Sequence, residues 1–194
     1  MSNQSRNKSE RPNNTKREAL VYLDIETQRT ADDVGGWFPE KMGLAVAVVL
    51  SGHQVQIFTE KDIGKLAEVL HSANCVVGYN IKDFDFKVLE GYEWVNLKAV
   101  KCLDLMRSLE TITGSRIMFS SIEKATMGIT QDFDGLEGVK LWKEGNLPGV
   151  MEFISNRVLA IKAVHEYGRT NGEVFHYPKN SSRRKRIEVE WSNR

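Results

Sequence analysis

The order of apolar and polar residues along the chain predicts alternating strands and helices. Compact apolar runs and runs alternating with period two are typical of buried strands. Such runs occupy residues 20–25, 42–52, 53–60, 74–80 and 97–106, the last leading into a helix. Apolar residues at helical spacing predict helices over residues 61–73, 84–89, 122–127, 136–144 and 149–167. The last of these is expected to end at Gly168.

Two further runs, 172–178 and 185–191, predict a closing hairpin near the end of the sequence. A first hairpin followed by strand–helix alternation predicts a mixed sheet flanked by helices, the arrangement of an α/β domain. No internal repeat is visible. The sequence therefore predicts one domain over residues 19–191, preceded by a disordered basic leader over residues 1–18.

Composition agrees with a single globular domain. The chain has 194 residues, 41% of them hydrophobic, which is enough for one full-sized core. No apolar run approaches the roughly 18 residues of a membrane span, and the polar first residues lack the apolar stretch of a secretory signal. Cys75 and Cys102 both lie within apolar runs, which favours buried thiols over a disulfide or a metal pair. We expect a cytoplasmic protein with no membrane partner.

Basic residues gather in two segments although the net charge is only +1. Residues 1–17 hold five basic residues against one acid, and residues 183–186 are all basic. Such runs attract polyanions by releasing counterions. Each run taken alone is better explained as solvated chain.

The stretch "YLDIET" places Asp24 and Glu26 at the end of the first predicted strand. Side chains two apart share one face of a strand, so the two acids should repel and raise each other's pKa unless a cation lies between them. Paired carboxylates suit a hard cation such as Mg²⁺ or Mn²⁺. Taken alone, the pair is better explained by carboxylates that reach water at a strand end.

A third acid, Asp85, follows the strand at residues 74–80 and begins a helix. Parallel strands bring their carboxyl ends to one edge of a sheet, where ligands collect. If the two strands are neighbours, Asp85 should join Asp24 and Glu26 there. Asn80 and Phe84 could shape the turn, while Asp83 is expected to face solvent or cap the helix.

These motifs carry a family resemblance. "LDIET" and "NIKDFD" resemble the first two motifs of the DEDD superfamily of 3′–5′ exonucleases, which share the ribonuclease H-like fold. The stretches "TADDVGGW", "MGLAVAVV", "CLDLM", "LWKEG" and "GEVFHYP" with "IEVEW" resemble a bacterial branch related to DNA-polymerase proofreading domains. The resemblance covers residues 19–191. It implies an α/β fold with a five-stranded mixed sheet, the first three strands antiparallel, and a C-terminal β-hairpin.

The resemblance also implies a two-metal mechanism. In such enzymes four carboxylates hold two divalent ions, Mg²⁺ or Mn²⁺, which generate the attacking hydroxide and stabilise the leaving 3′ oxygen. By motif position Asp24 would bridge both ions, Glu26 would bind the nucleophile-side ion, and Asp85 would serve the second. Thr27, Asn80 and Phe84 are the candidates for binding the substrate, a single-stranded 3′ end of DNA or RNA.

The third motif departs from the family pattern. On the last large helix, Phe153 stands where a Tyr is expected and Arg157 where an Asp is expected. The two lie four residues apart, on one helical face. Arginine stays protonated and cannot ligate a cation. A guanidinium about 4 Å from a carboxylate gains about 4 kcal/mol at an effective dielectric near 20. We therefore hypothesise that Arg157 lies against Asp24 or Glu26 in the place of the nucleophile-side ion.

Other acids do not restore the motif convincingly, and a histidine-bearing variant of it is absent. Asp104 occupies a family position that supports the fold, and Glu152 should point off the site face. Asp132 and Asp134 are expected to cap a helix or to be solvated, and His165 lies two turns too late. Two functions stay open: a metal-dependent 3′–5′ exonuclease, and a catalytically inactive nuclease-like domain that binds nucleic acid or a protein partner.

Overall fold

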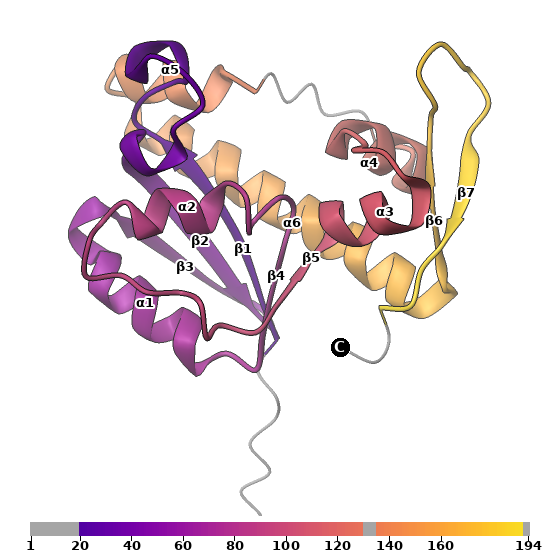
Figure 1. The fold of residues 1–194 in the computed structure, drawn as a ribbon, viewed down its shortest axis with the longest axis horizontal. Coiled ribbons are helices and arrows are strands. Elements are labelled where there is room, and N and C mark those ends of the chain that lie inside the picture. The colour runs from indigo at the N-terminus through magenta and orange to yellow at the C-terminus, as the bar shows by residue number, and fades with distance from the viewer. Residues whose placement is uncertain (1–19, 130–134, 192–194) are drawn as a thin grey trace, which may run out of the picture.

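A five-stranded mixed sheet forms the centre of the molecule (Figure 1). The computed structural model describes residues 20–129 and 135–191. The strands lie in the order β3-β2-β1-β4-β5, and their bounds are β1 Leu20–Thr27, β2 Leu44–Ser51, β3 Gln54–Thr59, β4 Cys75–Gly78 and β5 Cys102–Asp104. The pairs β1–β2 and β2–β3 are antiparallel, while β1–β4 and β4–β5 are parallel. The predicted sheet, with its first three strands antiparallel, is confirmed.

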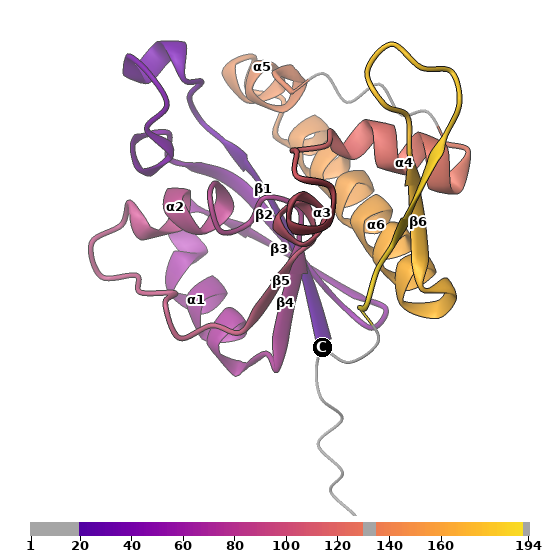
Figure 2. The same cartoon turned by 45° about the vertical axis from the view of Figure 1, so that its right-hand side comes forward.

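Helices cover both faces of this sheet (Figure 2). The α-helices are α1 Ile63–Ser72, α2 Asp85–Glu90, α3 Leu105–Thr113, α4 Phe119–Met127, α5 Glu137–Lys143 and α6 Leu147–Asn171. Short 3₁₀ turns are η1 Asp32–Val34, η2 Pro39–Lys41 and η3 Glu60–Asp62. The long helix α6 lies on one face and contacts β1 and β2, whereas α1 and α2 lie on the other face.

The alternation of side chains along β1 separates two hydrophobic cores. Tyr22 packs with the apolar side of α6, in one core, while Val21, Leu23 and Ile25 pack in the other core, with α1 and α2. Since the side-chain period of a strand is two, the even-numbered positions of β1 all face α6. This parity directs the side chains of the first acidic motif toward the long helix.

A separate two-stranded hairpin, β6 Glu173–His176 and β7 Lys185–Glu188, packs against α4. Two hydroxyl groups of α4 fix it. Ser121 Oγ donates to the carbonyl of Tyr177 and accepts from its N–H, and Thr126 Oγ1 does the same with Phe175, all at 2.9 to 3.1 Å. The predicted C-terminal hairpin is confirmed.

The prediction that the long helix ends at Gly168 is wrong. Helix α6 continues to Asn171 and ends at Gly172, whose φ of 69° is the left-handed conformation that favours glycine at a helix end. Gly168 is buried instead, and a methyl group there would overlap the indole of Trp191. Glycine at position 168 permits close packing of the helix on the chain that follows β7.

Replacing Gly168 with Ala is expected to destabilise the fold by about 1–3 kcal/mol, the usual cost of overpacking a core. The matched control is Gly64→Ala in α1, where a new methyl group meets only Trp94 at an ordinary 3.7 Å. That substitution should stabilise the protein by about 0.5–1 kcal/mol through helix propensity. Urea unfolding of both variants measures the difference, and equal effects would contradict this role of Gly168.

Neither cysteine forms a disulfide, but both are only half-buried. The prediction of buried thiols outside a disulfide is therefore right about the disulfide and wrong in the degree of burial, because Cys75 and Cys102 begin the short strands β4 and β5 near the sheet boundary. Across residues 20–129 and 135–191, no helix has the length and apolar character needed to cross a membrane.

Candidate functional site

Asp24 and Glu26 are buried inside the fold. They lie opposite Val48 and Val46 of β2, and their exposed fractions are 1% and 5%. Burial raises the pKa of Asp24 to about 6 and that of Glu26 to about 7, and in both cases the Arg157 guanidinium opposes the rise. The alternative in which these carboxylates reach water is wrong, because the helix layer of α6 and α5 covers this face of β1.

Arg157 of α6 lies directly against Asp24. Its Nη2 donates a hydrogen bond to Asp24 Oδ1 at 3.2 Å, and its Nε lies 3.0 Å from Oδ2 in an ion pair that lacks hydrogen-bond alignment. The guanidinium also lies 5.8 Å from the ring centre of Phe153, which confirms that the two share one helical face. The predicted contact between Arg157 and the first acidic motif is confirmed, and Asp24 is the residue that makes it.

Asp85 shares this electrostatic environment. It is the first residue of α2 and its exposed fraction is 2%. Burial raises the pKa of Asp85 well above its usual range, and repulsion by Asp24 raises it further, while Arg157 acts in the opposite direction. Its Oδ2 atom is buried and has no hydrogen-bond partner among the described residues. The three predicted acids therefore come together near the carboxyl ends of β1 and β4.

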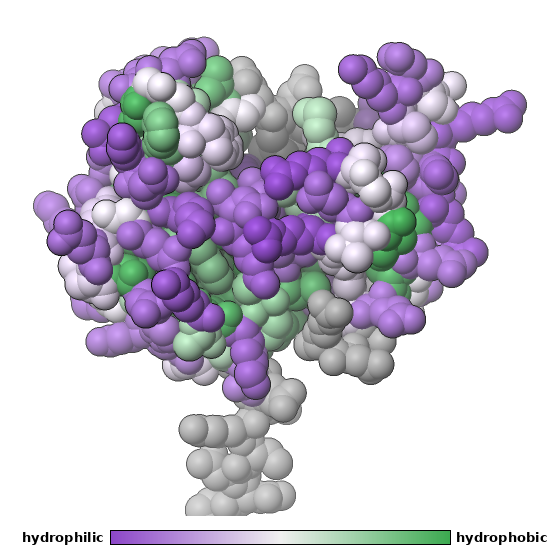
Figure 3. All heavy atoms as spheres, viewed as in Figure 1, coloured by the Kyte–Doolittle hydropathy of each residue, from purple (hydrophilic) through white to green (hydrophobic). Residues whose placement is uncertain are grey.

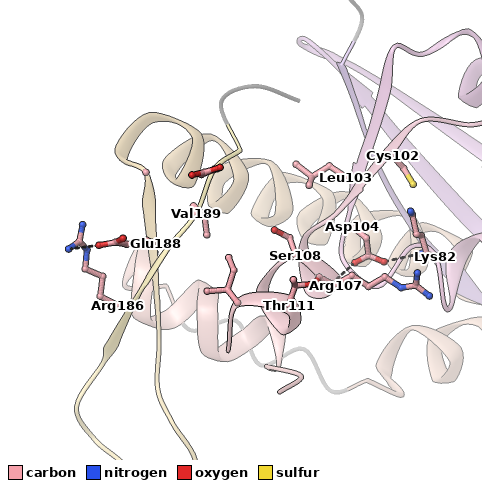
Figure 4. Close-up of a pocket in the computed structure, with 13 residues that line it drawn as sticks. Lys82, Cys102, Leu103, Asp104, Arg107, Ser108, Thr111, Arg186, Glu188 and Val189 are labelled. Carbon is pink, nitrogen blue, oxygen red and sulfur yellow. Dashed lines mark hydrogen bonds and ion pairs between the residues drawn. The ribbon is translucent and has the colours of Figure 1, made fainter. Parts of the chain in front are cut away.

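Asp104 fixes the turn that leads to Asp85. Its carboxylate accepts from four backbone N–H groups, those of Asn80, Lys82, Met106 and Arg107, at 3.0 to 3.3 Å. It caps α3 with two of these bonds and holds the β4–α2 turn with the other two. Asn80, in that turn, has a φ of 66°. The expectation that Asp104 supports the fold is confirmed, and Figure 4 shows its carboxylate directed toward Lys82.

A cleft of about 370 Å³ opens beside these groups. Asp85 and Arg157 line it together with residues from the β4–α2 turn, α3, the start of α4 and the chain before α5. The remaining lining residues are Tyr79, Asn80, Phe84, Met106, Arg116, Ile117, Met118, Phe119, Ser120 and Gly135. The cleft thus joins the acidic edge of the sheet to an apolar wall.

Two of the three predicted substrate-binding residues line this cleft, and one does not. Asn80 and Phe84 do, and Phe84 stacks on Trp37 with ring centres 5.5 Å apart. The Thr27 side chain is buried, and its hydroxyl donates to the carbonyl of Arg29 at 2.9 Å. Thr27 therefore stabilises the chain that leaves β1.

A larger cavity, of about 590 Å³, lies at the outer edge of β5 between α3 and the chain around β7 (Figure 4). None of the three predicted acids lines it. Two of its charged side chains are already paired: Asp104 accepts the backbone bonds described above, and Arg186 forms ion pairs with Glu173 and with Glu188, which also lines the cavity. Asp85 and Arg157 line the smaller cleft instead.

Sequence reasoning missed the residue that closes the site over Glu26. Gly138, inside α5, lies so close that a methyl group there would overlap the Glu26 carboxylate. An isolated glycine within a predicted helix is a signal for such a close approach. Sequence reasoning also missed the cleft wall at residues 116–120, because no periodic pattern in the sequence places this segment beside the acids.

The remaining candidate groups are accounted for within the fold. Asp83 does not cap α2 but forms ion pairs with Arg107 and Arg116. Glu152 is exposed, as predicted. His165 is fully buried, bonded at Nδ1 to the Tyr22 hydroxyl at 3.0 Å, and stacked on Trp191. Asp132 and Asp134 lie outside the described residues.

The acids as arranged do not fit a two-metal site. Within the parts of the chain that the structure describes, no three His, Cys, Asp or Glu side chains are placed to hold a metal ion together. Both oxygens of Asp24, the acid that should bridge two ions, face the guanidinium of Arg157. A divalent cation at Asp24 would have to displace a fixed positive charge.

The sheet order and flanking helices define a ribonuclease H-like fold. The family model RNase_H_2, of the RNase_H superfamily, matches residues 21–145. The chain therefore belongs to the RNase H superfamily, and the fold inferred from the sequence motifs is confirmed.

Two solved structures show the same fold. One is the family B DNA polymerase from the hyperthermophilic archaeon Pyrobaculum calidifontis, with a TM-score of 0.60 and 14% identity over 77% of this chain and 24% of the polymerase. The other is the zinc-bound E. coli ExoI–ssDNA complex, with a TM-score of 0.51 and 14% identity over 79% of this chain and 41% of ExoI. The chain thus spans less than half the length of either protein. No curated protein matched it.

Proposed function

We propose that this protein binds the 3′ end of a nucleic-acid strand in the cleft beside Asp85, and that Arg157 prevents phosphodiester hydrolysis. The observation that carries the proposal is the ion pair between Arg157 and Asp24, with Nε and Oδ2 3.0 Å apart. This ion pair lies at the edge of the sheet where the three acids meet. The fold around it is shared with the structure of an ExoI–ssDNA complex.

The cleft supports binding of a terminal nucleotide. Phe84, backed by Trp37, and Phe119 present aromatic surface on which a base can stack. Asn80 and Asp85 line the cleft, and each has one buried oxygen, Asn80 Oδ1 and Asp85 Oδ2, without a hydrogen-bond partner in the described chain. A buried polar atom that is left unsatisfied costs about 1–3 kcal/mol. Binding would remove that cost by drawing either oxygen round to a hydroxyl or amino donor of the nucleotide.

Hydrolysis is opposed by charge. Hydrolysis of a phosphodiester in this fold requires acids that concentrate divalent cations, and here the central acid is already neutralised by arginine. Phe153 lacks the hydroxyl that a tyrosine would offer to a water molecule. The chain's own residues can bind and orient a strand end, but they do not assemble the fourth acid.

A second candidate is a working 3′–5′ exonuclease that uses Mg²⁺ or Mn²⁺. It is favoured by the convergence of Asp24, Glu26 and Asp85, and by the 29% exposure of the Arg157 side chain, which leaves it room to turn outward. In that case Asp24, Glu26 and Asp85 would be the metal ligands.

Binding and cleavage assays with labelled single-stranded DNA and RNA separate the two candidates. We expect binding that survives chelation of divalent cations, with no shortening of the strand. Phe84→Leu, which keeps bulk but removes the stacking ring, should weaken binding roughly 5- to 150-fold, as the loss of one base–aromatic stack does. Trp94→Leu removes an exposed ring outside the cleft and should have no effect.

Two outcomes would contradict the proposal. Stepwise shortening from the 3′ end by the wild-type protein, lost in Asp24→Ala, would establish the exonuclease. No retention of DNA or RNA at low salt, together with no shortening of the strand, would exclude both candidates.

A further inference from the structure

The β6–β7 hairpin carries a concentrated positive charge. Residues 177–187 contain five basic residues and no acid. All five are exposed, and they are Lys179, Arg183, Arg184, Lys185 and Arg186. The net charge of the whole chain is only +1, so this charge is a local feature of the hairpin.

Two of these cations anchor the hairpin. Arg184 lies 4.4 Å from the ring centre of Phe175 and donates to the carbonyl of Ala125 in α4 at 3.3 Å. Arg186 pairs with Glu173 of the neighbouring strand and with Glu188. These contacts and the hydroxyl bonds from α4 hold the hairpin against the body of the protein.

The other three cations are available to a ligand. Lys179, Arg183 and Lys185 form no ion pair with the residues that the structure describes. They lie on a hairpin that is held in place, and none of the three is paired with an acid of the described chain. Their surroundings suit an anionic partner, since a partner phosphate would meet a charge that is not already neutralised.

The hairpin loop begins beside the wall of the cleft. Tyr177, where the loop starts, is bonded to Ser121, and Met118, Phe119 and Ser120 line the cleft. Less than one helical turn of α4 therefore separates the loop attachment from the cleft wall. Figures 1 and 2 both show the loop at the end of the molecule that carries α5 and the ends of β1 and β4, and in Figure 3 that upper corner is strongly hydrophilic.

We propose that this hairpin is a phosphate-binding arm that holds the strand on the 5′ side of the nucleotide in the cleft. The inference rests on the proposed function. A cleft of about 370 Å³ has the size of a site for one small ligand, so a longer strand must continue across the surface. The strand then leaves the cleft past Lys179, Arg183 and Lys185. These side chains bind its phosphates without recognising its base sequence.

The test is the salt dependence of binding to a single-stranded oligonucleotide of about 20 nucleotides, long enough to leave a one-ligand cleft. In Arg183→Gln/Lys185→Gln the slope of log affinity against log salt should flatten by about 1.4, or 0.7 for each lost phosphate contact. At about 0.1 M salt this corresponds to a roughly 25-fold loss of affinity, taking equal affinity at 1 M. The full chain is used throughout, so the basic segment before residue 18 contributes equally to every variant.

The control is Lys98→Gln/Lys101→Gln, which also removes two exposed positive charges, but from the chain before β5. It should keep the wild-type slope. A wild-type slope in the hairpin variant, or equal flattening in the control, would overturn the proposal. So would failure of the wild-type protein to bind the long oligonucleotide.

A mononucleotide separates this proposal from the function on which it rests. The mononucleotide occupies the one-ligand cleft and has no further phosphates on its 5′ side to reach the hairpin, so its binding should be weakened by Phe84→Leu and unchanged by the hairpin variant. If the mononucleotide does not bind while the hairpin variant still flattens the slope for the long strand, the arm stands and 3′-end binding in the cleft fails. If the hairpin variant weakens the binding of both ligands equally, the hairpin does not act as a separate phosphate-binding arm, and the proposal fails.

Discussion

Phe153→Tyr combined with Arg157→Asp is expected to switch on shortening of a strand from its 3′ end in Mg²⁺ or Mn²⁺. The double substitution removes the guanidinium from Asp24 and adds a fourth carboxylate on the same face of α6, four residues from the restored hydroxyl. Exchanging Arg for Asp changes the charge of the site by two units. The lost attraction, about 4 kcal/mol at 4 Å and an effective dielectric near 20, is what a metal ion currently has to overcome.

Thermal unfolding provides a readout that does not depend on cleavage. The folded-state pKa values of Asp24 and Glu26, about 6 and about 7, lie above their usual values of 3.8 and 4.5. The neutral carboxyl groups therefore contribute fully to the free energy of unfolding below about pH 4, and this contribution is lost as the pH rises through 6 to 7. Without Arg157, and with one more acid, this loss should be larger. The midpoint temperature of the double variant should fall between about pH 5 and pH 8, and Mn²⁺ should restore it at the higher pH.

Two controls make this result decisive. Phe153→Tyr/Arg157→Lys restores the hydroxyl but keeps the positive charge, and it should not cut or respond to Mn²⁺. Adding Asp24→Asn to the active variant should abolish both effects. If the wild-type protein cleaves as fast as the double variant, Arg157 does not prevent cleavage.

Asp104→Ala is expected to cause the largest loss of stability, about 4 kcal/mol. Four backbone N–H groups lose their acceptor at once, two at the start of α3 and two in the β4–α2 turn. Loss of an N-cap costs about 1 kcal/mol, and each further charged hydrogen bond costs about 1.5 kcal/mol or more when its donor stays buried. Urea unfolding gives the free-energy difference.

Asp104→Asn is the matched control. Its amide oxygen can keep the bonds that Oδ1 accepts from Asn80, Met106 and Arg107, and only the Oδ2 bond from Lys82 is lost. The expected cost is about 1–2 kcal/mol, since one donor loses its acceptor. If the alanine variant unfolds within 1 kcal/mol of the wild type, Asp104 does not hold the two turns together.

Periodicity predicted a mixed sheet flanked by helices, and the family resemblance supplied its five-stranded topology and the meeting of the acids at one edge. Asp24 and Glu26 are two apart on a strand, and Asp85 follows a parallel neighbour of that strand. The contact of Arg157 with Asp24 or Glu26 was hypothesised from the position that Arg157 takes in the third motif of the resemblance, and the structure shows that Asp24 makes it. Their roles as catalytic residues and metal ligands stay predictions.

What the sequence could not predict depends on paths of the chain that have no period. The stacking of Trp37 on Phe84 and the bond from Thr27 to Arg29 are set by the segment between β1 and β2. Asp83 was expected to be solvated or capping, but its partners come from α3 and from the chain that follows it. Gly168 resembles a helix stop locally, and only the position of Trp191 explains why it is not one.

The 133 residues that separate Asp24 from Arg157 bear on how the protein is made. A ribosome delivers the strand with the acids first and the helix with their counter-charge much later. Until α6 emerges, a sheet assembled from β1, β2 and β4 would leave exposed the face that carries the carboxylates, together with the apolar side chains that later pack under this helix, which disfavours its early completion. We therefore expect the nascent chain to settle into its final form only after synthesis has passed residue 157, as one late cooperative step.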